Sequence, residues 1–150
     1  MTRQLTCALL AVLLSGCITS QYSVPSQRQE YTLTTTEQEV EMGRRLAHQV
    51  ALELTLVIDE PLQDRVRSIG QRLVAVCDRK ELIYHFAVVS DPEVNAFSLP
   101  GGYVYVNEGL IKRAGSDDEL AAVLAHEIAH IAARHSVKRY ETGLGAQLVH

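Results

Sequence analysis

The sequence has few aromatic residues and no run of basic residues. It contains no tryptophan, aromatic residues make up only 5% of its 150 positions, and its lysines and arginines are scattered. Nucleic-acid-binding proteins usually carry clustered basic charge, so the sequence gives no support to nucleic-acid binding. Hydrophobic residues make up 47% of the chain, which is enough to bury a core and predicts a globular protein rather than a disordered one.

The sequence also lacks a hydrophobic run long enough to span a bilayer. Its N-terminal run, LTCALLAVLL at residues 5–14, has ten residues and follows Arg3, a pattern typical of a signal peptide. The run leads into LSGC at residues 14–17, which resembles a bacterial lipobox, where cleavage precedes a cysteine that carries the lipid. We predict a lipoprotein signal peptide at residues 1–16 and lipidation of Cys17. An ordinary secretory leader with a cysteine near its cleavage point is the alternative.

The segment after the leader is rich in serine, threonine and glutamine. We predict that residues 17–35 are the lipidated cysteine and a flexible tether, which would anchor the protein to a membrane without spanning it. Ile18, in place of an aspartate after the lipidated cysteine, favours the outer membrane in bacteria that use that sorting rule. The predicted location is therefore the bacterial cell envelope, lipid-anchored and facing the periplasm.

Cysteine is scarce in the remaining chain. Cys7 falls in the leader and Cys17 would be acylated, so only Cys77 is left and the folded part has no internal disulfide. Cys77 continues an apolar helical stripe, and we interpret it as a small core residue rather than a nucleophile.

Helical and extended patterns follow one another in the predicted domain, residues 36–150. Thr36 and Glu39 have the spacing of a capping box and predict the start of a helix, and Asp59 with Pro61 predicts a second one. Its apolar stripe contains Leu62, Val66, Ile69, Leu73 and Val76.

Strands are expected next. Residues 83–90 are rich in β-branched and aromatic side chains, and the pattern of residues 94–109 predicts a strand, a turn and a second strand. A second capping box, Ser116 with Glu119, predicts a further helix. The predicted fold class is α+β: a helical scaffold, and a small β-sheet with the last of these helices packed beside it.

That helix carries two histidines and a glutamate in the segment AVLAHEIAHIAARHS, residues 122–136. Helical residues four apart differ by about 40° in direction and lie about 6 Å apart along the axis, so His126 and His130 can reach one ion. Glu127 lies beside them as a base for a metal-bound water, which completes the HExxH arrangement. Zinc held by imidazoles lowers the pKa of such a water to about 7. The alternative is a helix whose histidines lie on a partly solvated face and bind no metal.

The segments NAFSLPGGYVYVNEGLI, at residues 95–111, and DDELAAVLAHEIAHIAARHS, at residues 117–136, resemble the zinc metallopeptidases of the HtpX and CAAX-prenyl-protease family. The soluble, lipid-anchored periplasmic branch is the most similar, and TTTEQEVEMGRRLA at residues 34–47 resembles the segment that opens its domain. The resemblance implies a zincin-like fold, one zinc ion per chain, zinc ligands at His126 and His130, and a catalytic base at Glu127.

The resemblance also implies that residues 95–106 border the substrate cleft. Asn95, Ala96, Phe97, Gly101 and Gly102 are the candidate substrate-binding residues, because a strand beside a zinc helix can pair with an extended peptide through backbone hydrogen bonds. An ordinary hairpin is the alternative interpretation of these residues.

A third zinc ligand is harder to find in the sequence. On one continuous helix Glu141 would lie about 16 Å from the site, and His135 would project about 140° away. A helix break at Gly143 and Gly145, which would return Glu141 or His150 to the site, is the less favoured route. The resembled family takes its third ligand, a glutamate, from several dozen residues further on. We therefore expect these residues to be the N-terminal part of a longer peptidase domain, with a naturally short form as the alternative.

Two functions follow from this reading. The first is a membrane-anchored zinc metalloendopeptidase that hydrolyses peptide bonds of unfolded or misassembled envelope proteins. The alternative is a catalytically incomplete lipoprotein that binds or chaperones envelope proteins. Glu127 favours the enzyme, because a pure binder has no need of a base beside the metal.

Overall fold

The structure is a computed structural model that describes residues 19–23 and 28–147. It divides into two compact units, Met1–Thr35 and Thr36–His150. In the first unit, β1 (Thr19–Ser23) and β2 (Arg28–Thr32) pair as an antiparallel hairpin within the segment predicted as a tether. Cys17 and the predicted signal peptide lie outside the described residues, so the leader and the lipidation site stay predictions. The tether, in which the hairpin lies, also stays a prediction.

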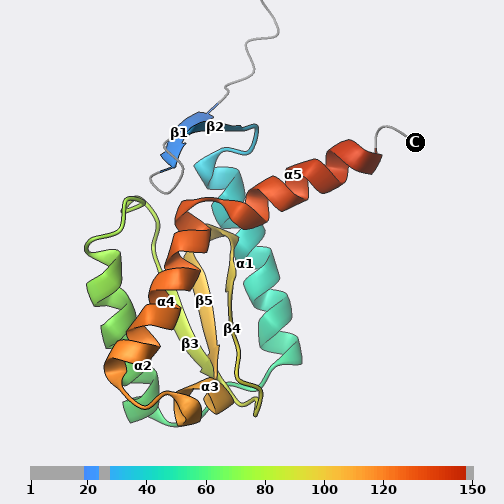
Figure 1. Cartoon of the computed structure of the whole chain (residues 1–150). Coiled ribbons are helices and arrows are strands. Elements are labelled where there is room, and N and C mark those ends of the chain that lie inside the picture. Colours follow the sequence, from blue (N-terminus) through green and yellow to red (C-terminus); the bar gives the residue numbers. More distant parts are fainter. Residues whose placement is uncertain (1–18, 24–27, 148–150) are drawn as a thin grey trace, which may run out of the picture. The chain divides into compact units, whose positions relative to one another are not determined.

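The second unit combines helices with a small mixed sheet (Figure 1). In the sheet, β5 lies between β3, which is parallel to it, and β4, which is antiparallel. The elements in chain order are α1 (Thr36–Glu53), α2 (Glu60–Val74), β3 (His85–Val89), β4 (Ala96–Leu99), the 3-10 turn η1 (Pro100–Gly102), β5 (Tyr103–Asn107), α3 (Glu108–Arg113), α4 (Asp117–Ala132) and α5 (His135–Gln147). The predicted α+β class is confirmed.

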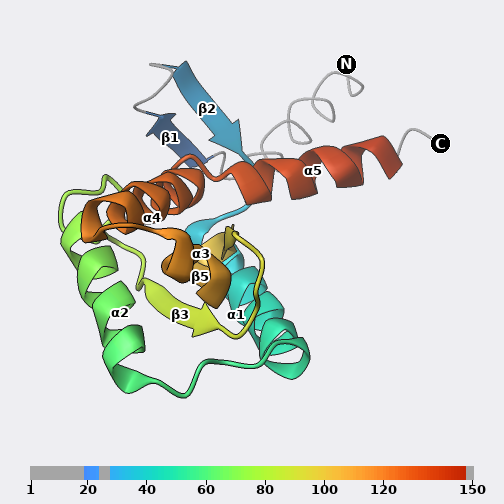
Figure 2. The same cartoon turned by 60° about the horizontal axis from the view of Figure 1, so that its bottom comes forward.

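The core forms where α2 and α4 pack against each other and against the sheet (Figures 1 and 2). Its fully buried members are short or branched aliphatic side chains from the strands and from the inner faces of the two helices: Val66, Val88, Val104, Val106, Leu120 and Leu124. Helix α1 contacts β4 and the turn η1, and α5 extends away from the sheet (Figure 1). The described ranges include no helix with both the length and the apolar character needed to cross a bilayer.

The second predicted helix begins where the sequence indicates. The carboxylate of Asp59 accepts a hydrogen bond from the backbone N–H of Leu62 at 3.0 Å, and Pro61 lies in the first turn. The predicted stripe is wrong at its end, because α2 ends at Val74 and Val76 is exposed. Cys77 is therefore outside the helix, where its sulfur lies 3.5 Å from the Tyr84 hydroxyl and its side chain packs partly against the core.

The helix that carries the histidines ends earlier than a continuous helix would. Helix α4 ends at Ala132, and Arg134 has a φ of +54°, the left-handed conformation that stops an α-helix. Helix α5 then starts at His135 in a new direction (Figure 1). The assumption of one continuous helix from His126 to Glu141, under which Glu141 and His135 were placed away from the site, is therefore wrong.

Candidate metallopeptidase site

The start of α4 is fixed by the predicted cap, with one change. The Ser116 hydroxyl accepts a hydrogen bond from the Glu119 backbone N–H at 3.2 Å, as in a capping box. The Glu119 carboxylate accepts from the backbone N–H of Gly115 at 2.8 Å, one residue before the expected partner. The cap sets where α4 begins, and the position of each later side chain around the helix follows from it.

His126 and His130 lie side by side on an accessible face of α4. Their Nε2 atoms are 3.0 Å apart and their ring centroids 4.5 Å apart, with the ring planes nearly perpendicular. Two nitrogen ligands of one tetrahedral zinc ion lie about 3.3 Å apart, given bonds of about 2.0 Å. His126 is exposed and His130 partly exposed, so an ion could reach both nitrogens from solvent. The pair fits two corners of a zinc site with little adjustment.

Glu127 projects from the inner side of the same helix turn. Its side chain is buried, and its Oε2 accepts a hydrogen bond from the Ser98 hydroxyl of β4 at 2.8 Å. This contact restricts the carboxylate next to the histidine pair. Ser98 was not among the residues predicted from the sequence. Ser98 lies two residues from Ala96, which packs against the core, so strand alternation places both on the face toward α4.

His135 lies against His130, contrary to the sequence prediction. The Nδ1 atoms of the two rings are 2.5 Å apart, and the ring centroids 4.8 Å. The prediction failed because it assumed a continuous helix, whereas the chain turns at Arg134 and brings the next residue back beside the last turn of α4. Burial lowers the pKa of His130 below its usual value, and the neighbouring His126 and His135 lower it further.

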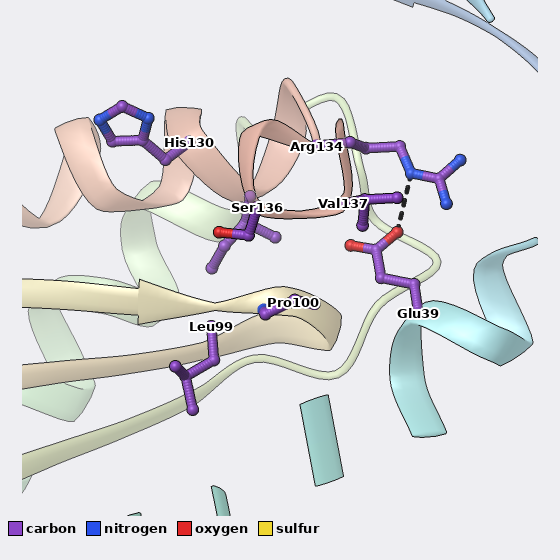
Figure 3. Close-up of a pocket in the computed structure, with 8 residues that line it drawn as sticks. Glu39, Leu99, Pro100, His130, Arg134, Ser136 and Val137 are labelled. Carbon is purple, nitrogen blue, oxygen red and sulfur yellow. Dashed lines mark ion pairs between the residues drawn. The ribbon is translucent and has the colours of Figure 1, made fainter. Parts of the chain in front are cut away.

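A buried ion network lies at the other side of this turn (Figure 3). Glu39 of α1 is fully buried, and its carboxylate lies 2.9 Å from the Nε of Arg134 and 2.9 Å from an Nη of Arg79. Burial by itself lowers the pKa of Arg79, but its hydrogen bond to Glu81 and the charge of Glu39 outweigh this and leave the pKa raised. The network joins α1 to the α4–α5 junction beside a small pocket that Leu99, Pro100, His130 and Val137 help to line.

The first predicted capping box is only half right. Helix α1 starts at Thr36 as expected, but Glu39 turns inward to the two arginines rather than toward the helix end. Its carboxylate also accepts a hydrogen bond from the Gly101 backbone N–H at 3.3 Å. Glu39 has the spacing of a capping residue, but its side chain is buried and has a structural role instead.

The candidate substrate residues occupy two different environments. Asn95 is exposed, and Ala96 and Phe97 are half-buried on β4, where Phe97 stacks on Tyr105 with ring centroids 5.0 Å apart. Strand β4 is an edge of the three-stranded sheet. Gly101 and Gly102 are buried, with φ values of +75° and +101° that glycine adopts without strain. Contact of these five residues with substrate stays a prediction.

The described residues contain no group of three histidine, cysteine or acidic side chains placed to hold one metal ion. His135 faces the Nδ1 side of His130, away from the paired Nε2 atoms. Helix α5 is continuous across Gly143 and through Gln147, so the helix break considered at the glycines does not occur there. His150 lies outside the described residues.

The chain matches known peptidases over most of its length. The model of peptidase family M48 matches residues 60–150. The beta-barrel assembly-enhancing protease of Yersinia pestis is 34% identical over 105 residues, which cover 70% of this chain and 22% of that protein. The Escherichia coli K12 protein of the same name is 33% identical over 104 residues, 69% of this chain and 21% of that protein.

A mitochondrial relative matches a shorter segment with a higher identity. The mitochondrial metalloendopeptidase OMA1 of Schizosaccharomyces pombe is 46% identical over 74 residues, 49% of this chain and 22% of that protein. The chain thus spans about a fifth of the length of these relatives. The family match covers more than half of the chain and confirms the resemblance drawn from its motifs. The chain belongs to peptidase family M48, the zinc metallopeptidases with a zincin-like fold.

Proposed function

We propose that the protein is a zinc metalloendopeptidase in which His126 and His130 hold the metal and Glu127 is the catalytic base. The observation that carries the proposal is the geometry on α4: two imidazole Nε2 atoms 3.0 Å apart, with a buried carboxylate on the adjacent residue. Further ligands would come from outside the residues that the structure describes.

The chain's own residues divide the chemistry between them. A bound zinc ion supplies Lewis-acid activation of water and of a peptide carbonyl. Glu127 accepts the proton of the attacking water and then donates it to the departing amine. The Ser98 hydroxyl, 2.8 Å from Oε2, keeps one carboxylate oxygen occupied and leaves the other for that proton.

The edge strand β4 is the proposed site of substrate binding. An extended peptide can add to an exposed sheet edge through main-chain hydrogen bonds, and β4 carries Ser98, which contacts the base. Side chains at Asn95, Ala96 and Phe97 would then meet the residues that flank the scissile bond. Recognition through the backbone suits unfolded segments of varied sequence.

The proposed substrates are unfolded or misassembled proteins of the bacterial envelope. The support comes from two sources: the lipobox-like LSGC before Ile18, and relatives named beta-barrel assembly-enhancing protease. A lipid on Cys17 would hold the enzyme at the membrane surface, facing the periplasm, and we place it at the outer membrane.

The test of the catalytic proposal is Glu127→Gln in the full-length protein, with Asp118→Asn on the same helix as the matched loss of one carboxylate. Asp118 is exposed in the first turn of α4. We expect Glu127→Gln to lower cleavage of a denatured, fluorogenic protein substrate by at least about a hundredfold, with zinc content unchanged, because general acid–base catalysis typically contributes this much. Asp118→Asn should cleave normally.

The same variants separate enzyme from binder. Unchanged cleavage in Glu127→Gln would refute the assigned mechanism. No cleavage by the wild type, together with equal retention of unfolded proteins by both, would instead favour the binding function.

The anchor has its own test. Labelling with a radioactive fatty acid should mark the wild-type protein and leave Cys17→Ser unlabelled, and Cys7→Ser is the control because Cys7 lies within the predicted leader. Equal labelling of Cys17→Ser would contradict the lipidation site.

A further inference from the structure

We propose that His135 is a positioning residue for the metal ligand His130, whose Nδ1–H donates a hydrogen bond to Nδ1 of His135. The inference rests on the proposed function, because it assigns His130 to zinc. It adds a residue that lies outside the HExxH pattern and that the sequence alone placed on another side of the helix.

The two nitrogens of the His130 ring face different neighbours. Nε2 lies 3.0 Å from Nε2 of His126, and Nδ1 lies beside Nδ1 of His135. A neutral imidazole that uses Nε2 as a ligand must carry its proton on Nδ1. The proton that zinc binding requires on His130 therefore points at a nitrogen that can accept it.

The backbone turn that brings His135 to this place is unusual for its residue type. Arg134 has a φ of +54°, a strained left-handed conformation that residues other than glycine adopt only rarely. Without this turn, a residue five positions after His130 would project about 140° away from it. The strained backbone conformation at Arg134 therefore brings the two histidines into contact.

Contacts of the Arg134 side chain stabilise this turn. The side chain is buried and its Nε lies 2.9 Å from the fully buried Glu39 carboxylate (Figure 3). Arg79 binds the same carboxylate and also reaches the backbone oxygen of Ile131 at 3.4 Å, in the last turn of α4. Val137, fully buried two residues after His135, fixes the first turn of α5.

The expected consequence is on zinc affinity. Histidines that bind metal usually donate their other ring N–H to a partner, which fixes the ring orientation and the tautomer and raises the basicity of the ligand nitrogen. Loss of such a partner typically weakens metal affinity by about 10- to 100-fold. His135 is exposed, so its replacement removes this hydrogen bond without opening a cavity in the core.

The experiment compares His135→Leu with His135→Asn in the full-length protein. The amide oxygen of asparagine can take the place of Nδ1 as an acceptor, whereas leucine cannot. His48→Leu is the matched control, because His48 is an exposed histidine on α1. Zinc affinity is measured by competition with a chromophoric chelator, and the His130 tautomer by nitrogen-15 NMR of the zinc-loaded protein.

We expect His135→Leu to bind zinc about 10- to 100-fold more weakly, with loss of a resolved His130 Nδ1–H signal. His135→Asn should stay close to the wild type on both measures, and His48→Leu should match it. Unchanged affinity in His135→Leu, or equal weakening by leucine and asparagine, would overturn the proposal.

A fourth variant tells this failure from failure of the proposed function. His130→Ala should lose zinc whatever His135 does. Loss in His130→Ala with no change in His135→Leu overturns only the role of His135. Zinc affinity that survives His130→Ala contradicts the proposed metal site itself, and the role of His135 with it.

Discussion

Two clusters of charged or ionisable side chains lie on opposite sides of the turn at Arg134, and they are built differently. In one, Glu39, Arg79 and Arg134 are buried and their charges face one another. In the other, His126 is exposed and His130 partly so, and their nitrogens converge on a point that solvent can reach. We interpret the first cluster as a structural ion network whose charges pair within the chain, and we propose that the second is a ligand site for a metal ion.

Only the second cluster has a local sequence pattern. His126, Glu127 and His130 lie within five residues of one helix, so spacing alone predicts their common face. The buried cluster joins Glu39 to residues 40 and 95 positions away, a combination that no local pattern contains. The comparison predicts that damage to the first cluster lowers the stability of the fold, whereas damage to the second lowers activity alone.

The largest effect is expected at the buried cluster. Glu39→Ala removes the buried carboxylate that both arginines share, so each arginine loses a counter-charge in the interior, and the free energy of unfolding should fall by about 3–5 kcal/mol. Glu41→Ala is the control on the same helix, because Glu41 is half-exposed and pairs with the exposed Arg44 and Arg45. Urea unfolding followed by circular dichroism measures both. Equal stability of the two variants would contradict the structural role that we assign to the buried cluster.

The second largest effect is expected at Gly102. It tests whether this glycine stabilises the fold or contacts the substrate. An added Cβ at Gly102 would lie 2.4 Å from the Ile83 carbonyl oxygen, at a φ of +101°. Gly102→Ala should therefore lower the free energy of unfolding by about 1–3 kcal/mol. Thermal unfolding checks it. Normal stability with a raised KM would assign Gly102 to the substrate instead.

A smaller effect is expected at Ser98, where β4 contacts Glu127, the proposed catalytic base. Ser98→Ala removes one hydrogen bond to Glu127, worth about 1 kcal/mol, so kcat should fall by at most about tenfold while zinc content stays the same. Steady-state kinetics on a fluorogenic peptide measures it. A hundredfold loss would mean that Ser98 takes part in the chemistry rather than in holding the carboxylate.

The smallest effect is expected for a charge pair on the surface. Arg65 and Asp117 lie 2.7 Å apart between α2 and α4, but both side chains are exposed. Arg65→Ala should change the free energy of unfolding by about 1 kcal/mol or less. A loss as large as that of Glu39→Ala would show that burial is not what distinguishes the ion pairs of this protein.

The sequence predicted the parts of the fold that depend on local signals. Periodicity, the caps at Asp59 and Ser116, and the Pro100–Gly102 turn located α2, the β4–β5 hairpin and α4. The end of α2 was misplaced, since Val76 continues the apolar spacing after the helix has stopped at Val74. Apolar spacing predicts which face of a helix is buried but not where the helix ends.

The site was predicted in part for the same reason. The histidine pair follows from helical geometry, whereas Ser98 becomes visible only once β4 is known to pack against α4. His135 was assigned to the wrong side because nothing next to Arg134 in the sequence indicates a helix stop. The turn coincides with a salt bridge to Glu39, a residue 95 positions earlier in the chain. Long-range contacts of this kind leave no trace in local spacing.

The most direct test of the account is the zinc content of purified full-length protein and of His126→Ala and His130→Ala, measured by mass spectrometry of the metal. We predict about one zinc per wild-type chain, loss of the metal in both variants, and an unchanged circular dichroism spectrum, because both side chains are at least partly exposed. Zinc retained at the wild-type level in both variants would contradict the assignment of the metal site to α4.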